Sequence, residues 1–260
     1  KEYLLWTAGI DLAYEIGATN AWAIDIHMRC ATSVAAMKMA KDMIHADPEI
    51  NTVLICGGYR IGDLINLANT NTSFLFNISA GAGAMIVQRD WKRNQVLGTH
   101  LMTDGSMSRH VIVPASGTIR HPDDQAVKDG LFYFDLVEPE KMKSRLNEVS
   151  MTNWMHCVDE ALRKSGGLTR DDVSFLNMVL VKPSAHRDIL NQLGLTEEQS
   201  VYLSSYGHIG EQDSIINMIE GEKQGRLKDG DVMAIVGAGI GYVWGASVVR
   251  WGPVPPQLHA

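Results

Sequence analysis

The stretch VMAIVGAGIGYVWGASVV, residues 232–249, decides the fold of this chain. It holds 18 residues without a charged side chain, which is long enough to raise the question of a membrane-spanning helix. Glycines stand at 237, 239, 241 and 245, and glycines at this density favour strands and tight turns over a helix. We therefore expect two short buried strands, 232–236 and 246–250, joined by a Gly-rich turn at 237–241.

The segments upstream of this stretch show the same order of elements twice. Each copy has a helix, a short strand, a turn with a reactive side chain, a second helix, a second strand, glycines and a closing strand. Cys30 precedes Val53 by 23 residues, and His208 precedes Val232 by 24. The repeat predicts an α/β protein with two similarly folded halves about a pseudo-twofold axis. The expected elements of the first half are helix 4–16, strand 21–28, helix 32–45, strand 52–56, turn 81–83 and strand 84–88.

The second half is expected to begin with helix 151–164. The residues between the halves, 91–150, carry turn signals and are predicted to form a short hairpin and loops that cover a pocket. The remaining expected elements are strand 175–181, helix 186–193, strand 200–203, turn 206–208 and helix 213–224. The predicted domains are 1–90, the remainder of the first half with the nucleophile; 91–150, the hairpin and loops; 151–252, the second half; and 253–260, a tail.

Composition narrows the class of protein. The chain has 260 residues, 45% of them hydrophobic, which suffices for a large core. The net charge of -7 and the lack of a basic stripe argue against a nucleic-acid partner. Three widely spaced cysteines argue against a disulfide framework and for a reducing compartment, so we expect a cytoplasmic protein without a membrane segment.

Cys30 and His208 are the candidate catalytic residues. If the halves are related by a twofold axis, both residues lie at strand-to-helix junctions that face this axis, where they can meet. A thiol at a helix N-terminus is shifted toward the thiolate, and a nearby histidine can accept and return its proton. The backbone N–H of Cys30 is a predicted oxyanion donor, and the turn 237–241 can bring a second one.

Structural interpretations of the same residues stay open at this point. A single cysteine after an apolar strand is often a small buried hydrophobic residue, and His208 also suits a solvent-facing turn. Cys56 and Cys157 are expected in the core. The spacing of Gly81-Ala82-Gly83 is not a dinucleotide fingerprint, because a strand rather than a helix follows it.

Three segments resemble the β-ketoacyl-acyl-carrier-protein synthase III family of the thiolase superfamily. Residues 17–26 (GATNAWAIDI), which lead to Cys30, look like the approach to the family's nucleophile, and residues 81–85 (GAGAM) look like its Gly-rich turn. The segments 225–231 (GRLKDGD) and 237–246 (GAGIGYVWGA) are similar to its closing part nearly position by position. The match begins inside the family's pattern, so the first half is expected to be incomplete at its opening strands.

The resemblance implies a five-layered αβαβα fold, a homodimer or a heteromer with a related subunit, and Cys30 as the acyl acceptor. The second oxyanion donor is then the N–H of Ile240. The implied substrate is an acyl-CoA or an acyl carrier protein, with neither a permanently bound cofactor nor a metal.

This sequence departs from the family at two motifs. Pro183 and His186 stand where the family has His and Asn of a His-Gln-Ala-Asn motif, and His208 replaces the Asn of a Tyr-Gly-Asn turn. His208 is therefore predicted as the base, and His186 as a weaker candidate that steers the second substrate. Because these changes alter the donors that hold a thioester enolate, acylation of Cys30 is better supported than decarboxylative condensation.

Three functions follow from these residues. The first is an acyltransferase or condensing enzyme of the synthase III type, in which Cys30 passes its acyl group to a carbon or heteroatom acceptor. The second is a non-catalytic partner subunit of a synthase III-like heteromer. The third is a thiolase-type acetyl-CoA acyltransferase, which lacks a second cysteine near the terminal glycines.

Overall fold

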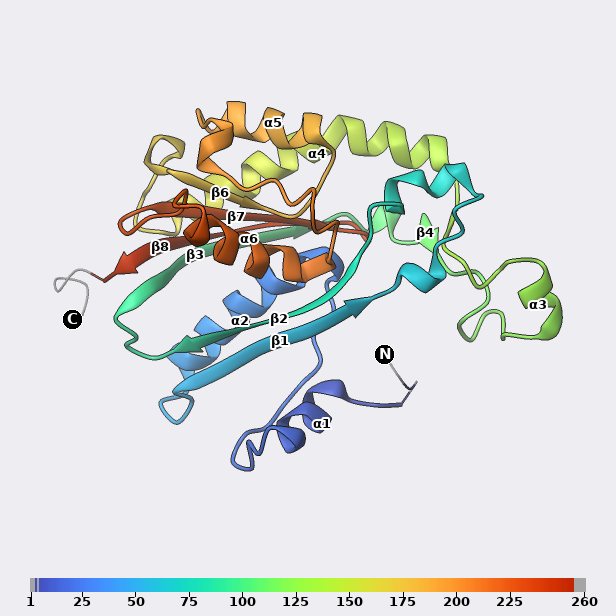
Figure 1. The fold of residues 1–260 in the computed structure, drawn as a ribbon, viewed down its shortest axis with the longest axis horizontal. Coiled ribbons are helices and arrows are strands. Elements are labelled where there is room, and N and C mark those ends of the chain that lie inside the picture. The colour runs from blue at the N-terminus through green and yellow to red at the C-terminus, as the bar shows by residue number, and fades with distance from the viewer. Residues whose placement is uncertain (1–2, 4, 255–260) are drawn as a thin grey trace.

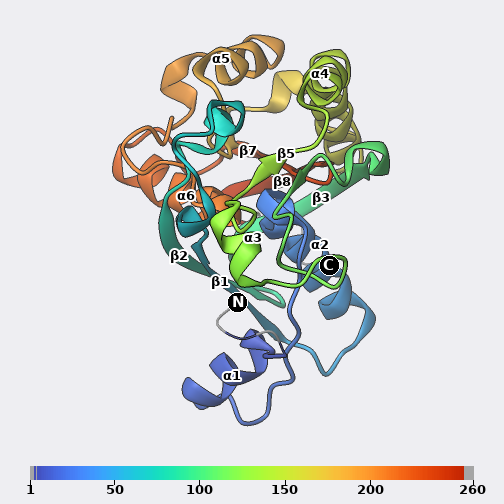
Figure 2. The ribbon, with the colours of Figure 1, turned by 90° about the vertical axis from the view of Figure 1, so that its right-hand side faces the viewer.

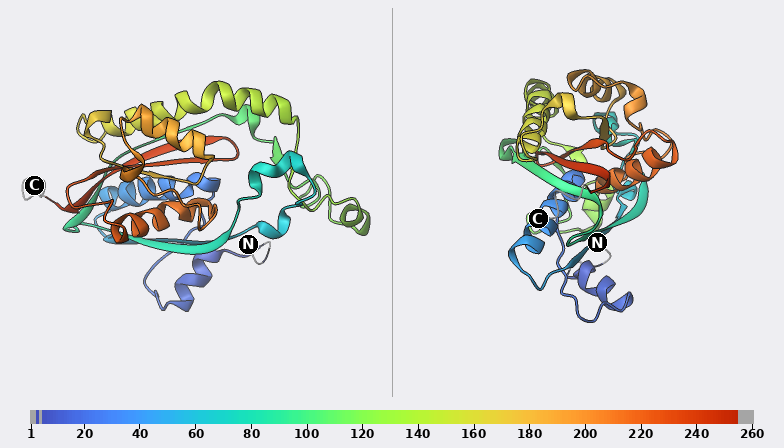
Figure 3. Two further views of the ribbon diagram at one scale, coloured as in Figure 1. Left: turned by 45° about the horizontal axis from the view of Figure 1, so that its top comes forward. Right: turned by 90° about the vertical axis from the view of Figure 1, so that its left-hand side faces the viewer.

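The molecule is built around a four-stranded sheet and a two-stranded ribbon, with helices between and around them (Figure 1). The computed structural model describes residues 3 and 5–254. A four-stranded sheet has the order β3-β8-β7-β6, and a separate ribbon pairs β1 with β2. Helices α2 and α6 lie between the two sheets, α4 and α5 cover the outer face of the larger one, and α1 lies beyond the ribbon (Figures 1 and 3). The predicted five-layered αβαβα architecture is confirmed.

The larger sheet contains the glycine-rich stretch 232–249. Strands β7 (Val232–Gly239) and β8 (Val243–Pro253) form an antiparallel hairpin, and Gly237 pairs with Gly245. On one side β6 (Phe175–Met178) runs parallel to β7, and on the other β3 (Arg93–Thr103) runs antiparallel to β8. β7 and nearly all of β8 are buried, because helices cover both faces of this sheet.

Apolar helix faces close the core on each side of this sheet. Helix α2 (Thr32–Ala46) buries Val34, Met37, Ala40 and Ile44, which recur every three or four residues as the sequence predicts. The other helices that cover the sheet are α4 (Pro139–Arg163), α5 (Pro183–Gln192) and α6 (Asp213–Lys223). The largest buried side chain is Trp244 of β8.

The first half is built around a two-stranded ribbon. β1 (Thr52–Arg60) and β2 (Ala80–Gln88) pair antiparallel, and every second residue of each strand is exposed. Cys56, predicted for the core, is exposed in this pattern, whereas Cys157 is buried as predicted. Helix α1 (Ala8–Glu15) stands apart from the rest in the side view (Figure 2).

Four predicted local structures differ from the observed ones. The turn predicted at 237–241 is shorter, because β7 continues to Gly239. Gly81-Ala82-Gly83 lies within β2 rather than in a turn. The missing side chain at Gly83 leaves room for Gln212, because a Cβ on Gly83 would lie 2.7 Å from Gln212 Oε1. Residues 21–28 form no strand. Residues 200–203 form no strand and contribute a single bridge, Leu176 to Ser200.

Residues 91–150 differ most from the prediction of a hairpin with loops. β3 belongs to the large sheet, and α4 begins at Pro139. Register shifts at 93/95 and 96/99 interrupt the alternation of β3, which hides it from a period-two search. Loops do join the short elements β4 (Val111–Ile112), α3 (Asp124–Lys128) and β5 (Asp135–Leu136). The division into domains stays a prediction, and most of the tail 253–260 lies outside the described residues.

Candidate active site

A short 3-10 turn, Arg29–Ala31, carries Cys30 into the start of α2. Arg29 adopts a left-handed φ of 52°, and the turn is fixed by Thr32, whose Oγ1 donates to Arg29 O at 2.6 Å and accepts from Met28 N at 2.9 Å. The end of β7 packs directly on this turn, because a Cβ on Gly239 would lie 2.8 Å from Met28 O and 3.1 Å from Cys30 N. The glycine lets the second half reach the Cys30 backbone.

His208 lies in the second half but is anchored by the first. Its backbone N–H donates to Asn77 O at 2.8 Å, and Ser79 N donates to His208 O at 2.9 Å. The preceding Gly207 has a φ of 73°, and a Cβ there would lie 2.8 Å from Asn77 O. Only a glycine fits both this backbone conformation and this close approach.

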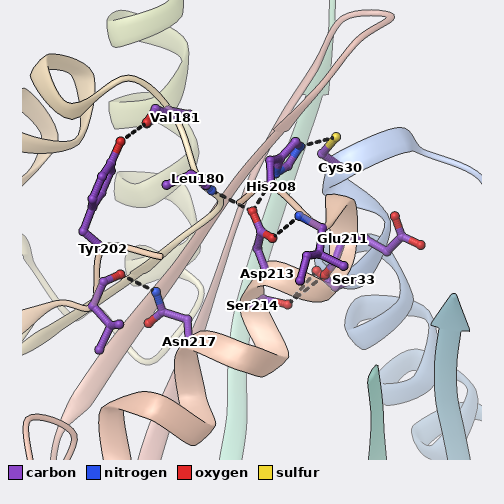
Figure 4. A network of polar contacts seen from close by, with 12 residues as sticks. Cys30, Ser33, Leu180, Val181, Tyr202, His208, Glu211, Asp213, Ser214 and Asn217 are labelled. Atoms are coloured by element: carbon purple, nitrogen blue, oxygen red, sulfur yellow. Dashed lines mark hydrogen bonds and ion pairs between the residues drawn. The ribbon is translucent and has the colours of Figure 1, made fainter. Parts of the chain in front are cut away.

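Three side chains form a linear polar network (Figure 4). His208 Nε2 lies 3.0 Å from Cys30 Sγ, and His208 Nδ1 lies 2.6 Å from Asp213 Oδ2. Asp213 is fully buried at the start of α6, and its two oxygens accept backbone N–H groups of Leu180 and Ile209, each at 2.7 Å. The carboxylate is therefore held in place, and it orients the imidazole toward the sulfur.

The charge on His208 follows from these partners. Burial lowers the pKa of the imidazole, but hydrogen bonds to Asp213 and Cys30 and the negative charge of both groups outweigh burial and raise the pKa to about 10. A protonated ring can donate from Nδ1 to Asp213 and from Nε2 to Cys30 Sγ at the same time. The arrangement is that of an activated nucleophile with its base and an orienting carboxylate.

Tyr59 of β1 lies near the same sulfur. Burial, followed by the charges of Cys30 and Glu211 and a hydrogen bond to Cys30, raises the pKa of Tyr59 far above its usual value, so its hydroxyl can donate to the sulfur. Its ring lies against Gly210, where a Cβ would lie 2.5 Å from ring carbons, and 6.2 Å from the His208 ring. Tyr59 and His208 thus both offer a hydrogen-bond donor to Cys30.

One large groove opens onto this network. Cys30, Tyr59, His208 and Glu211 line it, together with Ile240 at the turn after β7. Glu211 is half-buried, and burial raises the pKa of its carboxyl. An acyl thioester that enters the groove can therefore reach the sulfur.

The structure brings Cys30 and His208 together but leaves His186 elsewhere. His186 is buried in α5, where its Nε2 lies 3.1 Å from Ser200 Oγ and its ring packs edge-on against Tyr202. It does not line the groove, and burial lowers the pKa of its imidazole. The predicted part of His186 in steering a second substrate finds no support in these surroundings, because its ring serves the packing of α5.

Three residues of the site, Tyr59, Glu211 and Asp213, were not predicted from the sequence. Asp213 could have been found, because it stands five residues after the candidate base His208 and opens the predicted helix 213–224, from which its carboxylate can fold back on the imidazole. Tyr59 lies beyond the predicted end of its strand, and Glu211 lies in a turn without a periodic pattern. Their approach to Cys30 depends on contacts between the halves.

The residues that the structure describes contain neither a metal-site cluster nor a helix that could span a membrane. Residues 3 and 5–254 contain no group of three His, Cys, Asp or Glu side chains placed to hold a metal ion. Within the same residues, every helix is too short or too polar to cross a bilayer.

Known proteins resemble this chain in sequence and in fold. The family model of 3-oxoacyl-[acyl-carrier-protein] synthase III matches residues 24–105, and the model of its C-terminal part matches 162–251. A β-ketoacyl-[acyl-carrier-protein] synthase III of Chlorobium phaeobacteroides is 28% identical over 244 residues, which are 91% of this chain and 70% of the relative. One from Clostridioides difficile is 27% identical, with 91% and 69% of the two chains covered.

The solved structures agree on the fold. A 3-oxoacyl-(acyl carrier protein) synthase III of Pseudomonas aeruginosa superposes on this chain with a TM-score of 0.80 at 20% identity. The superposition covers 98% of this chain and 75% of the Pseudomonas chain. This likeness shows that the two chains share their fold. The two family models together match more than half of this chain, which therefore belongs to the β-ketoacyl-ACP synthase III-like family of the thiolase superfamily.

Proposed function

We propose that this chain is an acyltransferase of the β-ketoacyl-ACP synthase III type that carries its acyl group on Cys30. The observation that supports this function best is the line from Cys30 Sγ through His208 to the buried Asp213, with separations of 3.0 and 2.6 Å. A thiol between an imidazolium and a tyrosine hydroxyl is prepared for nucleophilic attack on a thioester.

The first half-reaction uses groups of both halves. The Cys30 thiolate attacks the carbonyl carbon of the acyl thioester, and the oxyanion that develops is held by the N–H groups of Cys30 and Ile240. The carbon–sulfur bond of the substrate then breaks, and the leaving thiolate takes the proton of His208. The products are acyl-Cys30 and a free thiol, with His208 neutral and still bonded to Asp213.

The second half-reaction returns the protein to its first state. An acceptor attacks the acyl carbon, Cys30 leaves as a thiolate, and His208 regains a proton. The acyl group is delivered by coenzyme A or by an acyl carrier protein, without a permanently bound cofactor. We further propose a cytoplasmic protein that assembles as a homodimer or with a related subunit.

The rival functions have less support. A non-catalytic partner subunit has no need of a thiol that opens onto a groove and is paired with a buried His–Asp pair. A thiolase-type enzyme requires a second active-site cysteine, but Cys56 is exposed and Cys157 is a buried residue of α4.

Intact mass spectrometry after incubation with short-chain acyl-CoA tests the proposal. We expect one acyl adduct on Cys30, absent from Cys30→Ala, and slower formation in Asp213→Asn by roughly ten- to hundred-fold. The exposed Asp188→Asn serves as the matched control and retains the wild-type rate. A protein without an adduct at any acyl length, or with an adduct on another residue, contradicts the proposal.

A further inference from the structure

Glu211 is a charged side chain of the groove that acyl transfer to Cys30 does not use. It belongs to the 3-10 turn Gly210–Gln212, which begins two residues after His208 and packs against β1. A Cβ on Gly57 would lie 3.3 Å from Glu211 Oε1, so the missing side chain at Gly57 gives the carboxyl its place. Two residues further along the same face of β1 stands Tyr59, which donates to Cys30.

The Glu211 carboxylate has no cationic partner of its own. Its Oε1 accepts one hydrogen bond, from Gln212 Nε2 at 3.2 Å. Among the residues that the structure describes, neither a lysine nor an arginine forms an ion pair with it. His208 acts electrostatically on the Glu211 carboxylate, but it is already paired with Asp213, so Glu211 can still act on whatever enters the groove.

Charges of both signs surround the reacting sulfur. Glu211 and Asp213 both act electrostatically on this cluster, and the imidazolium of His208 is shared between Asp213 and Cys30. Arg29 is close enough to act on Tyr59, and Arg60 and Lys182 also line the groove. Once Cys30 is acylated its charge is lost, and Glu211 faces the acceptor beside an imidazole that Asp213 makes strongly basic.

We propose that Glu211 makes the acceptor side of the groove selective for a protic heteroatom nucleophile, an amine or a hydroxyl, over an acceptor that brings a carboxylate. This inference rests on the proposed acylation of Cys30. A malonyl group would place its carboxylate near Glu211 in a partly desolvated groove, which costs free energy. The N–H of a primary amine or the O–H of a hydroxyl would instead find an acceptor in Glu211.

The transfer to such an acceptor balances with groups already in the site. The lone pair of the nitrogen or oxygen attacks the acyl carbon, and His208 Nε2 takes the proton from the attacking atom. The bond between the acyl carbon and Cys30 Sγ then breaks, and the sulfur leaves as a thiolate beside the imidazolium. The product is an amide or an ester, and the protein returns to its resting charge without an oxidant or a further reactant.

Single-turnover experiments on the full chain test this proposal. Acetyl-Cys30 is formed with acetyl-CoA, freed of excess donor, and mixed with malonyl-CoA, a primary amine or an alcohol at matched concentrations. Loss of the adduct is followed by intact mass. We expect wild-type protein to lose its acetyl group to the amine or the alcohol about ten-fold faster than to malonyl-CoA. The separate amine and alcohol arms identify which heteroatom is accepted.

The variant Glu211→Gln removes the charge and keeps the shape. It should reduce the preference for the heteroatom acceptor about ten-fold, whereas Glu198→Gln, at an exposed side chain, should leave it unchanged. A faster reaction of the wild type with malonyl-CoA, or an unaltered preference in Glu211→Gln, overturns the inference while acylation of Cys30 stands. If acetyl-Cys30 never forms, both the proposed function and this inference fail. Should Glu211→Gln not fold, the wild-type preference by itself still decides.

Discussion

At the residue scale, Asp213 accounts for the behaviour of His208. It is fully buried, and its oxygens are held by two backbone N–H groups as well as by the imidazole. The hydrogen bond to this carboxylate raises the pKa of the His208 imidazole. The sequence change from the family's Asn to His208 is thus accompanied by a second residue that makes a histidine useful at this position.

The raised pKa of His208 predicts a loss of stability at alkaline pH. The imidazole binds a proton up to about pH 10 in the folded protein, whereas in the unfolded chain it releases the proton near its ordinary value of 6.5. The folded state therefore binds more protons between these values, so this contribution is complete below pH 6.5 and is lost as pH rises through about 10.

Urea unfolding at a series of pH values from 6 to 10 measures this effect. The free energy of unfolding of the wild type should decrease across the series, and the decrease should be smaller in Asp213→Asn, whose His208 lacks the partnering charge. Parallel pH profiles for the two proteins would show that the His208–Asp213 pair does not set the proton affinity.

At the element scale, the hairpin β7–β8 holds the nucleophile in place through a glycine. The turn with Cys30 lies so close to the end of β7 that Gly239 has room for no side chain. Gly237, two residues earlier on the same face of the strand, has ordinary spacing, with 3.5 Å from a built Cβ to Ala31 Cα. The two glycines look alike in the sequence but differ in what they permit.

The pair Gly239→Ala and Gly237→Ala tests this difference. In Gly239→Ala the methyl group must displace Met28 O or the Cys30 backbone, so the acylation rate of Cys30 should fall at least ten-fold, as oxyanion donors lose their geometry. Gly237→Ala should retain a rate within about two-fold of the wild type, because its methyl group meets only ordinary contacts. Acylation rates from quenched mass spectra give both values. Equal rates in the two variants would disprove the close approach at Gly239.

At the scale of the whole molecule, one sheet supports the site from behind. Trp244 of β8 is 1% exposed and belongs to the core that joins this sheet to α4 and α5. Truncation of a fully buried tryptophan leaves a large cavity, which typically costs about 3–5 kcal/mol. Trp91, by contrast, is 61% exposed at the end of the β1–β2 ribbon.

Trp244→Ala should accordingly lower the free energy of unfolding by about 3–5 kcal/mol, and Trp91→Ala by less than about 1 kcal/mol. Urea titrations followed by circular dichroism measure both. If Trp244→Ala unfolds at the wild-type urea concentration, the core assignment for β8 is wrong.

Sequence alone determined the helices and strands with a regular pattern. The apolar period of α2 and the glycine-spaced run of β7 and β8 are local properties that steric and hydrophobic rules constrain directly. Local pattern failed at β3, whose bulges break the alternation, and at Gly81-Ala82-Gly83, where glycines mark close packing rather than a turn. In both places the deciding neighbour is distant in the chain.

The candidate site divides in the same way. The sequence singled out Cys30 and His208, because a thiol at a helix start and a histidine in a turn are chemical types that stand out in a doubled pattern. Only the tertiary structure decided that 3.0 Å separates them, that Asp213 and Tyr59 complete the site and that His186 does not. The physical reason is that pKa values and reactivity depend on burial and on groups a few ångströms away in space. In this chain those groups come from residues up to 178 positions apart.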